Sequence, residues 1–323
     1  MTLRSLGNST LSVPPVIFGA WAIGGWRWGG TDDAAAIRAI HASIDAGMTA
    51  IDTAPVYGFG HSESVVGRAI ADRRGAVQVL TKVGLRWDLT EGAHFFDSDG
   101  QSVYRNLRPA AIRAEVEGSL RRLGIDEIDL LQCHWPDPST PVEETMAGLA
   151  ALVTEGKVRA VGVSNFSPDL LSQAKAALGS VPLASTQPRY SLMDRAIEAD
   201  VLPWCIKAGV GTIVYSPIEQ GLLSGRVTME RTFPDDDGRS SSPKFTPESR
   251  ARVLAALEKT ADIAAAHSAT PAQVAIAWCV HQPGVTAAIV GARSPQQAIE
   301  NAEAGRIALT AAELERLSSV FSG

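Results

Sequence analysis

The stretch Ala50-Ile51-Asp52-Thr53-Ala54-Pro55-Val56-Tyr57-Gly58 decides how the chain folds. Met48 to Ile51 is predicted to be the end of a short buried strand, and Asp52 stands where that strand ends. The residues from Thr53 to Gly58 include proline and glycine, which are typical of a loop. A carboxylate and a phenol, those of Asp52 and Tyr57, are therefore expected just past one strand end.

Two later strand ends carry matching chemistry. Lys82 follows the apolar segment Val77 to Leu80, and His134 follows the segment Ile128 to Gln132. These side chains can meet the carboxylate and the phenol only if the strands are parallel, because the strands of a parallel barrel present their carboxyl ends on the same face.

The rest of the chain favours a parallel arrangement. Short apolar segments alternate with segments of helical periodicity, a pattern that forces right-handed crossovers and a parallel sheet. The predicted strands are Pro15 to Ala20, three that end at Asp52, Lys82 and His134, Val158 to Val163, one that ends at Gln187, Val210 to Tyr215, and Thr286 to Val290. Eight such units predict an α/β fold, a single (β/α)8 TIM barrel domain over residues 1–323. A doubly wound sheet is the alternative, but no G-x-G-x-x-G motif follows the first strand.

Further elements are predicted around these units. Residues 3–13 are expected to form an N-terminal β-hairpin and Thr310 to Phe321 an extra C-terminal helix, while Thr31 is expected to cap the first helix. The other predictions are a helix from Ala196 to Ala208, one continuous helix from Pro247 to His267, and long loops over residues 84–107 and 216–246.

Composition excludes several classes of protein. The chain has 323 residues, of which 45% are apolar and 20% charged, and its net charge is −6, so a large core is possible and no basic surface invites nucleic acid. Cys133, Cys205 and Cys279 are spaced too widely for a disulfide framework or a zinc site. Without an apolar leader or a membrane-length apolar run, we expect a cytoplasmic protein with no membrane partner and no metal.

The four strand-end residues indicate acid–base chemistry. Each alone has an ordinary structural explanation, but a lysine and an aspartate are costly to bury unless they pair. A nearby lysine cation favours the phenolate and lowers the pKa of a phenol from about 10. We therefore predict that Lys82, held by Asp52, lowers the pKa of Tyr57 and makes it a proton donor and acceptor, while His134 orients the substrate oxygen. None of these groups donates hydride, so a reaction at a carbonyl needs a cofactor.

These segments resemble the signatures of the aldo-keto reductase superfamily. The matching segments are Asp52-Thr53-Ala54 with Tyr57-Gly58, Thr81-Lys82, Gln132 to Asp137, and Gly162 to Phe166, in the family's order over nearly the whole chain. The resemblance implies a (β/α)8 barrel that reduces aldehydes and ketones with NADPH, sometimes with NADH. It also implies Tyr57 as the general acid/base, Lys82 and Asp52 as its tuning pair, and His134 as the residue that orients the substrate.

The resemblance assigns cofactor contacts as well. Ser164, Asn165 and Gln187 match the residues that hold the nicotinamide carboxamide, and Tyr215 matches the aromatic residue on which the nicotinamide stacks. The remaining matches are Ser216, Pro217, Gly221, Leu222, Ser224 and Gly225 around the pyrophosphate, and Gly291, Arg293, Ser294, Gln297, Glu300 and Asn301 around the adenosine.

The adenosine end departs from the common pattern. Many members have lysine and arginine where this chain has Gly291 and Gln297, although a branch related to potassium-channel β-subunits and bacterial reductases also has glutamine. Arg293 can still reach a 2′-phosphate. We therefore expect a preference for NADPH (NADP+) with NADH tolerated.

Aromatic residues are expected around the substrate. Five tryptophans, Trp21, Trp26, Trp28, Trp87 and Trp135, follow predicted strands, and such loops suit an apolar or sugar-like carbonyl compound. Trp21, Trp87 and Trp135 are the predicted pocket residues, whereas packing between loops is an equal alternative for Trp26 and Trp28. Phe95 and Phe96 are expected on the same rim, and Arg86 is expected at the surface.

Other functions remain open from the residues alone. The same site can oxidise a sugar or a secondary alcohol, and a redox-sensing NADPH-binding module keeps the same four residues. A metal hydrolase is disfavoured, because only His134 among the six histidines stands at a predicted strand end. The partner is expected to be a small carbonyl or alcohol, with the oligomeric state open.

Overall fold

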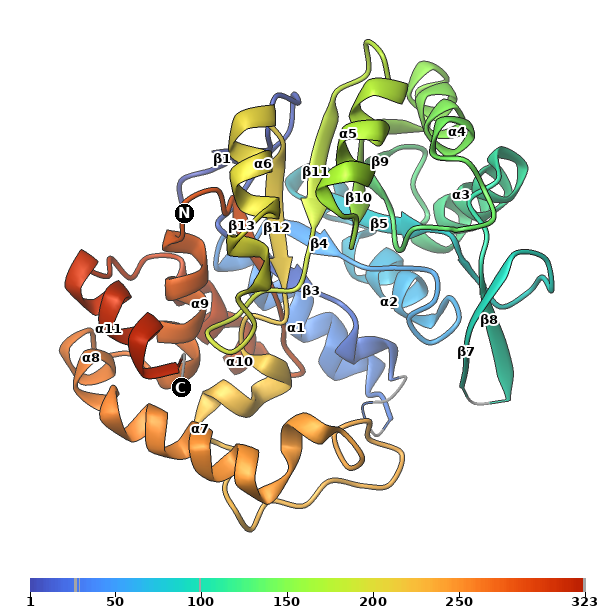
Figure 1. Ribbon diagram of the computed structural model, residues 1–323. Helices are drawn as coiled ribbons and strands as arrows, with labels where there is room; N and C mark the ends of the chain where they lie inside the picture. The colour runs from blue at the N-terminus through green and yellow to red at the C-terminus, as the bar shows by residue number, and fades with distance from the viewer. Residues whose placement is uncertain (26–27, 29, 99, 322–323) are drawn as a thin grey trace.

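The computed structural model describes residues 1–25, 28, 30–98 and 100–321. Within these residues, eight parallel strands close into a barrel in the order β3-β4-β5-β9-β10-β11-β12-β13 (Figure 1). The strands are β3 (Val16–Gly19), β4 (Ala50–Asp52), β5 (Gln78–Val83), β9 (Ile128–Cys133), β10 (Val158–Ser164), β11 (Leu183–Gln187), β12 (Gly211–Tyr215) and β13 (Ala287–Gly291). The predicted (β/α)8 barrel is confirmed, and every predicted strand overlaps one of these.

Helices cover the outside of the barrel (Figure 1). They are α1 (Asp33–Asp45), α2 (His61–Ile70), α3 (Pro109–Leu123), α4 (Val142–Thr154), α5 (Pro168–Ala177), α6 (Val201–Ala208), α7 (Pro247–Lys259), α8 (Ala261–Ala266), α9 (Pro271–His281), α10 (Pro295–Ala304) and α11 (Ala311–Phe321). Among the described residues, none of the helices has the length and apolar character needed to cross a membrane.

Three helix boundaries differ from the predictions. Asp32, rather than Thr31, caps α1: its side chain accepts from the Ala35 amide, while the Thr31 hydroxyl donates to Asp33. The helix predicted from Ala196 begins only at Val201, where the Asp200 side chain accepts from the Val201 amide. The helix predicted from Pro247 to His267 is broken at Thr260, whose hydroxyl donates to the Ala256 carbonyl oxygen at 3.0 Å.

The N-terminal hairpin closes the end of the barrel opposite the strand carboxyl ends. Its strands β1 (Arg4–Ser5) and β2 (Ser12–Val13) are antiparallel, as predicted. Leu6 and Leu11 are 0% and 1% exposed and share one apolar cluster with residues inside the barrel. The turn requires glycine at Gly7, where φ is +56° and an added Cβ would lie 2.7–2.8 Å from backbone atoms.

The insertion at residues 84–107, predicted as a loop, contains a small antiparallel sheet. Its strands β6 (Leu85–Arg86), β7 (Ala93–Ser98) and β8 (Gln101–Arg105) have the order β6-β8-β7. The β7–β8 hairpin projects from the barrel, on the right in Figure 1. The second insertion, residues 216–246, is a loop as predicted, apart from short 3-10 turns at Glu219–Ser224 and Pro243–Phe245.

Candidate active site

The four predicted strand-end residues meet at the carboxyl face of the barrel. The Lys82 Nζ donates to Asp52 Oδ1 at 2.6 Å, to the Thr53 carbonyl oxygen at 3.0 Å and to the Tyr57 hydroxyl at 3.3 Å. The ring centroid of His134 lies 5.6 Å from that of Tyr57, nearly perpendicular to it. The lysine, the carboxylate, the phenol and the imidazole therefore share one site.

Local backbone geometry explains why the phenol reaches this site. Asp52 is the last residue of β4 and pairs with Leu80 of β5, which brings the carboxylate beside Lys82 two residues further along. The loop then turns through Gly58, where φ is +64° and an added Cβ would lie 2.3 Å from the Gly24 carbonyl oxygen. This close approach needs glycine and folds Tyr57 back over the strand ends.

A chain of hydrogen bonds links the Asp52 carboxylate to the predicted nicotinamide residues. Gln187 Nε2 donates to Asp52 Oδ2 at 2.9 Å, and the Ser164 hydroxyl donates to the Gln187 carbonyl oxygen at 2.7 Å. Asn165 Nδ2 donates to Ser164 Oγ at 2.9 Å, and the Tyr215 hydroxyl donates to Asn165 Oδ1 at 3.0 Å. The bond from Gln187 to Asp52 was not predicted, because the two residues are 135 positions apart and share no local pattern.

Burial dominates the electrostatics of this site. Burial lowers the pKa of Lys82, but Asp52 and Tyr57 outweigh it, so that its pKa is raised and the ammonium stays charged. Burial raises the pKa of Tyr57, and Lys82 opposes this only in part. Lys82 lowers the pKa of Tyr57 as predicted, but the net shift is upward and not downward, because burial outweighs the lysine and Asp52 adds to the rise. Burial, helped by Lys82, holds the pKa of His134 well below its usual value, which leaves the imidazole neutral.

A cavity of about 640 Å³ opens over these residues, with Asp52, Tyr57 and His134 in its wall. Most of the predicted cofactor residues line it: Ser164, Asn165, Gln187, Tyr215, Ser216, Pro217, Gly221, Ser224, Gly291, Arg293, Gln297, Glu300 and Asn301. Leu222, Gly225 and Ser294 are not among the lining residues. Leu222 is buried in the apolar core, and the Ser294 hydroxyl caps α10 by accepting from the Gln297 amide.

The predicted pyrophosphate loop has an unusual backbone and a buried anchor. Ser216, Glu219 and Gln220 adopt φ angles of +61°, +46° and +54°, which non-glycine residues rarely do. The carboxylate of Glu219 is buried and accepts hydrogen bonds from Ser191, Arg189 and Lys244. This network offsets the cost of holding the loop beside the cavity.

Arginines gather along the cavity, and most of them were not predicted. Arg189, Arg226, Arg231 and Arg239 line it together with Arg293. Three of the four come from the loop over residues 216–246, which follows β12. The repeated arginines in this loop are the feature of the sequence that could have predicted them. Arg226 pairs with Glu300 and Arg239 with Asp237, whereas the Arg293 guanidinium donates to the Trp28 carbonyl oxygen at 3.1 Å.

Asp52, Tyr57, Lys82 and His134 are called the tetrad below. Aromatic and apolar side chains surround the tetrad end of the cavity, namely Trp21, Val56, Leu85, Phe95, Phe96 and Trp135. Trp28 lines the cavity too, with its ring 5.4 Å from that of Trp21. Trp87 is outside the lining, because its ring packs on Phe59 at 5.5 Å. Trp26 lies outside the described residues.

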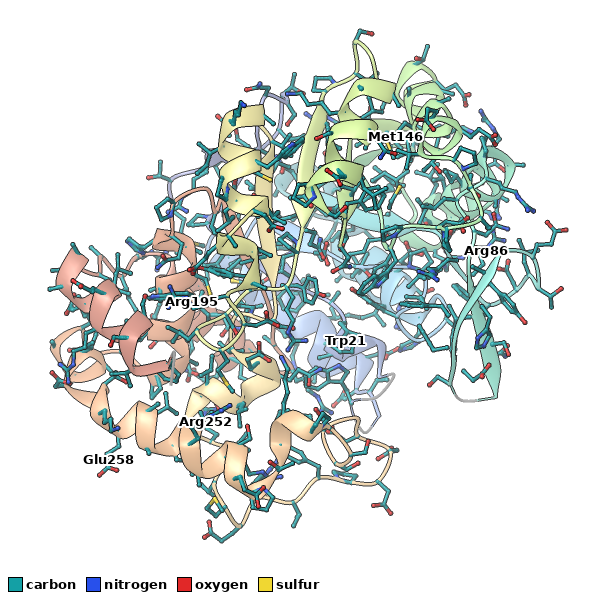
Figure 2. The ribbon with its side chains drawn as sticks, in the orientation of Figure 1. Trp21, Arg86, Met146, Arg195, Arg252 and Glu258 are labelled. Atoms are coloured by element: carbon teal, nitrogen blue, oxygen red, sulfur yellow. The ribbon has the colours of Figure 1, made fainter. Side chains whose placement is uncertain are left out.

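Arg86 is buried rather than at the surface as expected. Arg86 is only 5% exposed and lies in β6, which pairs with β8 (Figure 2). Two of its nitrogens donate to Asp88 at 2.8 and 2.7 Å, and a third donates to the Ala111 carbonyl oxygen at 2.9 Å. It holds the insertion to α3.

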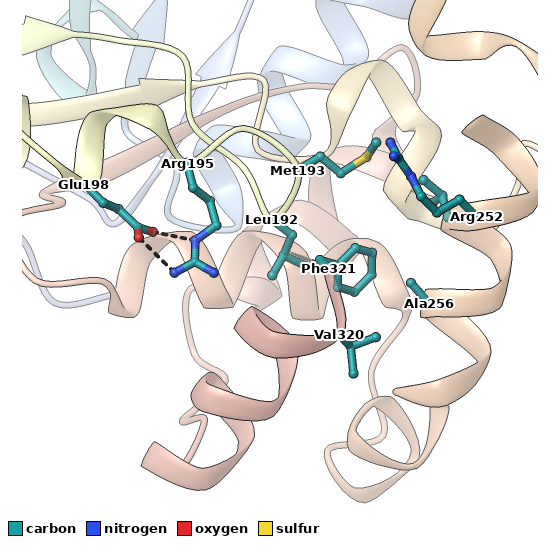
Figure 3. Close-up of a pocket in the computed structure, with 9 residues that line it drawn as sticks. Leu192, Met193, Arg195, Glu198, Arg252, Ala256, Val320 and Phe321 are labelled. Carbon is teal, nitrogen blue, oxygen red and sulfur yellow. Dashed lines mark hydrogen bonds and ion pairs between the residues drawn. The ribbon is translucent and has the colours of Figure 1, made fainter. Parts of the chain in front are cut away.

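Other features of the described residues lie apart from this chemistry. A separate cavity of about 630 Å³ between the segment from Leu192 to Glu198, α7 and α11 contains no tetrad residue, and its Arg195 is paired with Glu198 (Figure 3). Within the part of the chain that the structure describes, no three His, Cys, Asp or Glu side chains cluster to hold a metal ion. The three cysteines are free thiols, and burial raises the pKa of each.

Comparison with known proteins assigns the family. The sequence profile of the Aldo/keto reductase family matches residues 15–321. The chain is 39% identical to the aldo-keto reductase YhdN of Bacillus subtilis (strain 168), covering 92% of this chain and 86% of the relative. It is 38% identical to the NADH-specific methylglyoxal reductase of Escherichia coli (strain K12), covering 95% and 94%. The structure of the glycerol dehydrogenase AKR11B4 from Gluconobacter oxydans matches with a TM-score of 0.88 and 41% identity, covering 99% of this chain and 95% of that one. This chain therefore belongs to the aldo/keto reductase family of oxidoreductases.

Proposed function

We propose that this protein reduces an aldehyde or a ketone to an alcohol, with Tyr57 as the proton donor and a nicotinamide cofactor as the hydride donor. The contact of the Lys82 ammonium with both Asp52 and the Tyr57 hydroxyl, beside a cavity of about 640 Å³, carries this proposal. The fold does not require a buried phenol beside a paired lysine. Acid–base catalysis does use such an arrangement.

The roles of the four residues follow from their charge states. Tyr57 is protonated at neutral pH, because burial raises its pKa, so its O–H can donate to a carbonyl oxygen that gains negative charge. Lys82 is charged and stabilises the phenolate left behind, while Asp52 and Gln187 hold the lysine in place. Neutral His134 orients the carbonyl oxygen by a hydrogen bond.

The residues along the cavity fit a nicotinamide dinucleotide. One end offers an aromatic ring, Tyr215, beside the amide and hydroxyl groups of Asn165 and Ser164, which suit a flat ring with a carboxamide. The other end offers the N-terminus of α10, where Ser294 is the cap, and the guanidinium of Arg293, which suit a phosphate. When bound there, the cofactor would supply the hydride.

NADPH is the preferred cofactor in this proposal, and NADH is tolerated. Arg293 supports a 2′-phosphate contact, because its guanidinium donates to a backbone oxygen and, among the described residues, forms no close ion pair, although it interacts electrostatically with Asp237. Two observations favour NADH instead: Glu300 lines the cavity, and one relative is named as an NADH-specific enzyme.

A comparison of kcat/KM with NADPH and with NADH decides which cofactor is preferred. Arg293→Ala should lower the NADPH-to-NADH ratio about tenfold, the worth of one charge-assisted contact; an unchanged ratio removes Arg293 from the phosphate site.

Alcohol oxidation is the second candidate, favoured by the name of the glycerol dehydrogenase relative. The same tetrad serves both directions, so a single experiment separates them. Oxidation of NADPH and NADH is followed with a panel of aldehydes, ketones, quinones and keto-sugars, and reduction of the oxidised cofactors with a panel of sugars and secondary alcohols. Turnover of carbonyl compounds supports reduction. Turnover in neither panel would contradict the proposed function.

A further inference from the structure

Phe95 and Phe96 both line the main cavity, although neighbouring residues of a strand normally point to opposite faces. The pairing of β7 with β8 explains this. His94 of β7 pairs with Tyr104 of β8. Phe96 pairs with Val103, which is adjacent to Tyr104 on β8, so Phe95 is an extra residue that forms a β-bulge. Bulges occur next to active sites, where they redirect a side chain, and this one places two phenylalanine rings in the cavity wall.

These two rings belong to an aromatic wall that begins at the tetrad. The ring centroid of Phe95 lies 5.3 Å from that of Phe96 and 5.4 Å from that of Trp135. Trp135 directly follows His134, and the three rings pack with Tyr57 on a single apolar cluster. Tyr57 and His134 line the same cavity as the three rings. A compound whose carbonyl oxygen lies at the phenol and the imidazole therefore meets this wall within one cavity.

The Phe95 ring is held in place by the protein itself. The guanidinium carbon of Arg105, on β8, lies 5.0 Å from the Phe95 ring centroid, within the range of a cation–π interaction. Arg105 Nη1 also donates to the Pro136 carbonyl oxygen at 3.4 Å, which links the hairpin to the loop that carries Trp135. A wall that is already ordered loses less conformational freedom on binding, and so favours a ring that packs against it.

Charge is distributed unevenly around the carboxyl face of the barrel. β3, β4, β5 and β9 are consecutive in the barrel, and the segments after them supply the aromatic and apolar lining of the tetrad end. Outside the tetrad, the charged side chains among the described lining residues all come from the segments after β11, β12 and β13, namely Arg189, Arg226, Arg231, Arg239, Arg293 and Glu300. The charged half suits the phosphates of a dinucleotide, which leaves the apolar half for the substrate.

The apolar half discriminates between kinds of substrate. Phe95, Phe96 and Leu85 have no hydrogen-bonding group in their side chains. A hydroxyl or a carboxylate that lies against them loses its water without gaining a partner, whereas an apolar ring gains by leaving water. Aromatic loops suit both apolar and sugar-like compounds, and this wall favours the apolar ones.

We propose that Phe95, which the β-bulge turns into the cavity, is a specificity-determining residue that packs against an apolar ring of the substrate. The carbonyl group of that substrate is held at Tyr57 and His134. The preferred substrates are thus uncharged aldehydes or ketones with an aromatic or alicyclic ring, and polyhydroxylated or anionic carbonyl compounds are poor substrates. This inference rests on the proposed carbonyl reduction, of which it names the substrate class.

Three aldehydes that share a three-carbon chain test the preference: propanal, its phenyl derivative 3-phenylpropanal and its dihydroxy derivative glyceraldehyde. KM and kcat are measured with NADPH and expressed per concentration of free aldehyde. We expect kcat/KM for 3-phenylpropanal to exceed that for each of the other two about tenfold or more, because the ring is buried against the wall. The anion 4-oxobutanoate is compared with its methyl ester, and we expect the ester to be preferred about tenfold.

Variants of β7 locate the preference. Phe95→Ala should lower kcat/KM for 3-phenylpropanal about tenfold, mainly through KM, and leave that for propanal within about threefold. Phe95→Leu keeps an apolar side chain and should restore part of the loss. His94→Ala, which replaces the exposed neighbour of Phe95 on the same strand, should leave the preference unchanged.

A binding measurement keeps the inference separate from the reaction. Binding of 3-phenylpropan-1-ol and of glycerol to the protein with NADP+ is followed by NMR titration, and we expect the phenyl alcohol to bind more tightly and Phe95→Ala to remove the difference. Equal kcat/KM for propanal and 3-phenylpropanal, a preference for glyceraldehyde, or an equal loss for both aldehydes in Phe95→Ala would overturn the assignment. Failure to reduce any of the aldehydes would instead count against carbonyl reduction, while the two alcohols still decide the role of Phe95.

Discussion

Tyr57 donates no hydrogen bond to any residue that the structure describes and receives one from Lys82, which leaves its proton available for a ligand. We expect Tyr57→Phe to lower kcat by roughly 10²–10⁴-fold, the usual worth of general acid–base catalysis, while cofactor binding is retained. Stopped-assay turnover and a fluorescence titration with NADPH measure the two quantities. Tyr104→Phe, which removes a phenol on β8, in the small sheet outside the barrel that carries Lys82, is the control. Near-normal turnover in Tyr57→Phe would exclude the phenol from the mechanism.

Lys82 opposes the effect of burial on the phenol, so its removal should raise the pKa of Tyr57 further. Alcohol oxidation needs the phenolate as proton acceptor, and its rate therefore rises as pH passes through the Tyr57 pKa. In Lys82→Met we expect this rise at higher pH and a rate lower by about 10²-fold or more at any pH below it. The measurement is a pH–rate profile for oxidation. A profile that stays in place or moves to lower pH would show that Lys82 does not tune the phenol.

Single residues at the site were predictable where a local pattern marks them. Asp52, Lys82 and His134 each follow an apolar strand, and parallel strands bring such residues together. The direction of the Tyr57 pKa was not predictable, because it depends on how completely the folded chain removes the phenol from water. Nor was the bond from Gln187 to Asp52, which exists only once β11 and β4 face each other inside the closed barrel.

Among the elements, α3 supports the strand that carries Lys82. Glu115 of α3 is 5% exposed, and its Oε2 accepts from the Gly84 amide at 2.8 Å, just past β5. Burial raises the pKa of Glu115 to about 8, against about 4.3 for an unfolded glutamate. Between these values the folded chain holds more protons than the unfolded chain, so the free energy of unfolding falls as the pH rises through this window.

Glu115→Gln should remove that dependence. The amide oxygen can still accept from Gly84, but no proton is lost at alkaline pH, so we expect a smaller decline in stability between about pH 5 and pH 8 and a variant more stable than the parent near pH 8. Urea denaturation across this range measures the free energy of unfolding. Glu117→Gln, on the same helix but only partly buried and paired with Lys157, should keep the parental slope. Equal slopes in the parent and Glu115→Gln would contradict a protonated Glu115.

Elements were predictable wherever hydrophobic periodicity is strong. The barrel strands are short apolar runs and were placed correctly, whereas the β7–β8 hairpin carries polar residues on both faces and was interpreted as a loop. The break at Thr260 arises because its hydroxyl competes for the Ala256 carbonyl oxygen, which a periodicity argument does not detect. The cap of α1 is displaced by one residue, from Thr31 to Asp32, in keeping with the stronger preference of aspartate over threonine for the N-cap position.

The whole molecule separates stability from chemistry along the barrel axis. The hairpin seals one end and the tetrad occupies the other, so a change at the sealed end should alter stability but not catalysis. Leu6→Ala, at a site that is 0% exposed, should cost about 2–5 kcal/mol in the free energy of unfolding and leave KM unchanged. Denaturation and steady-state assays below the melting temperature measure both. Leu3→Ala, at a site that is 52% exposed, should cost little. A raised KM in Leu6→Ala would show that the two ends are coupled.

The burial of the cysteines makes this protein a convenient carrier for an optical reporter. Thiol-reactive dyes attack the thiolate, and burial both hides Cys133, Cys205 and Cys279 and keeps them protonated. A maleimide should therefore ignore the folded protein and modify a cysteine introduced at the exposed Gln101, at the start of β8. Such a label would stand on the hairpin that carries Phe95 and Arg105, where its emission can follow ligand arrival in real time without a substrate that absorbs light.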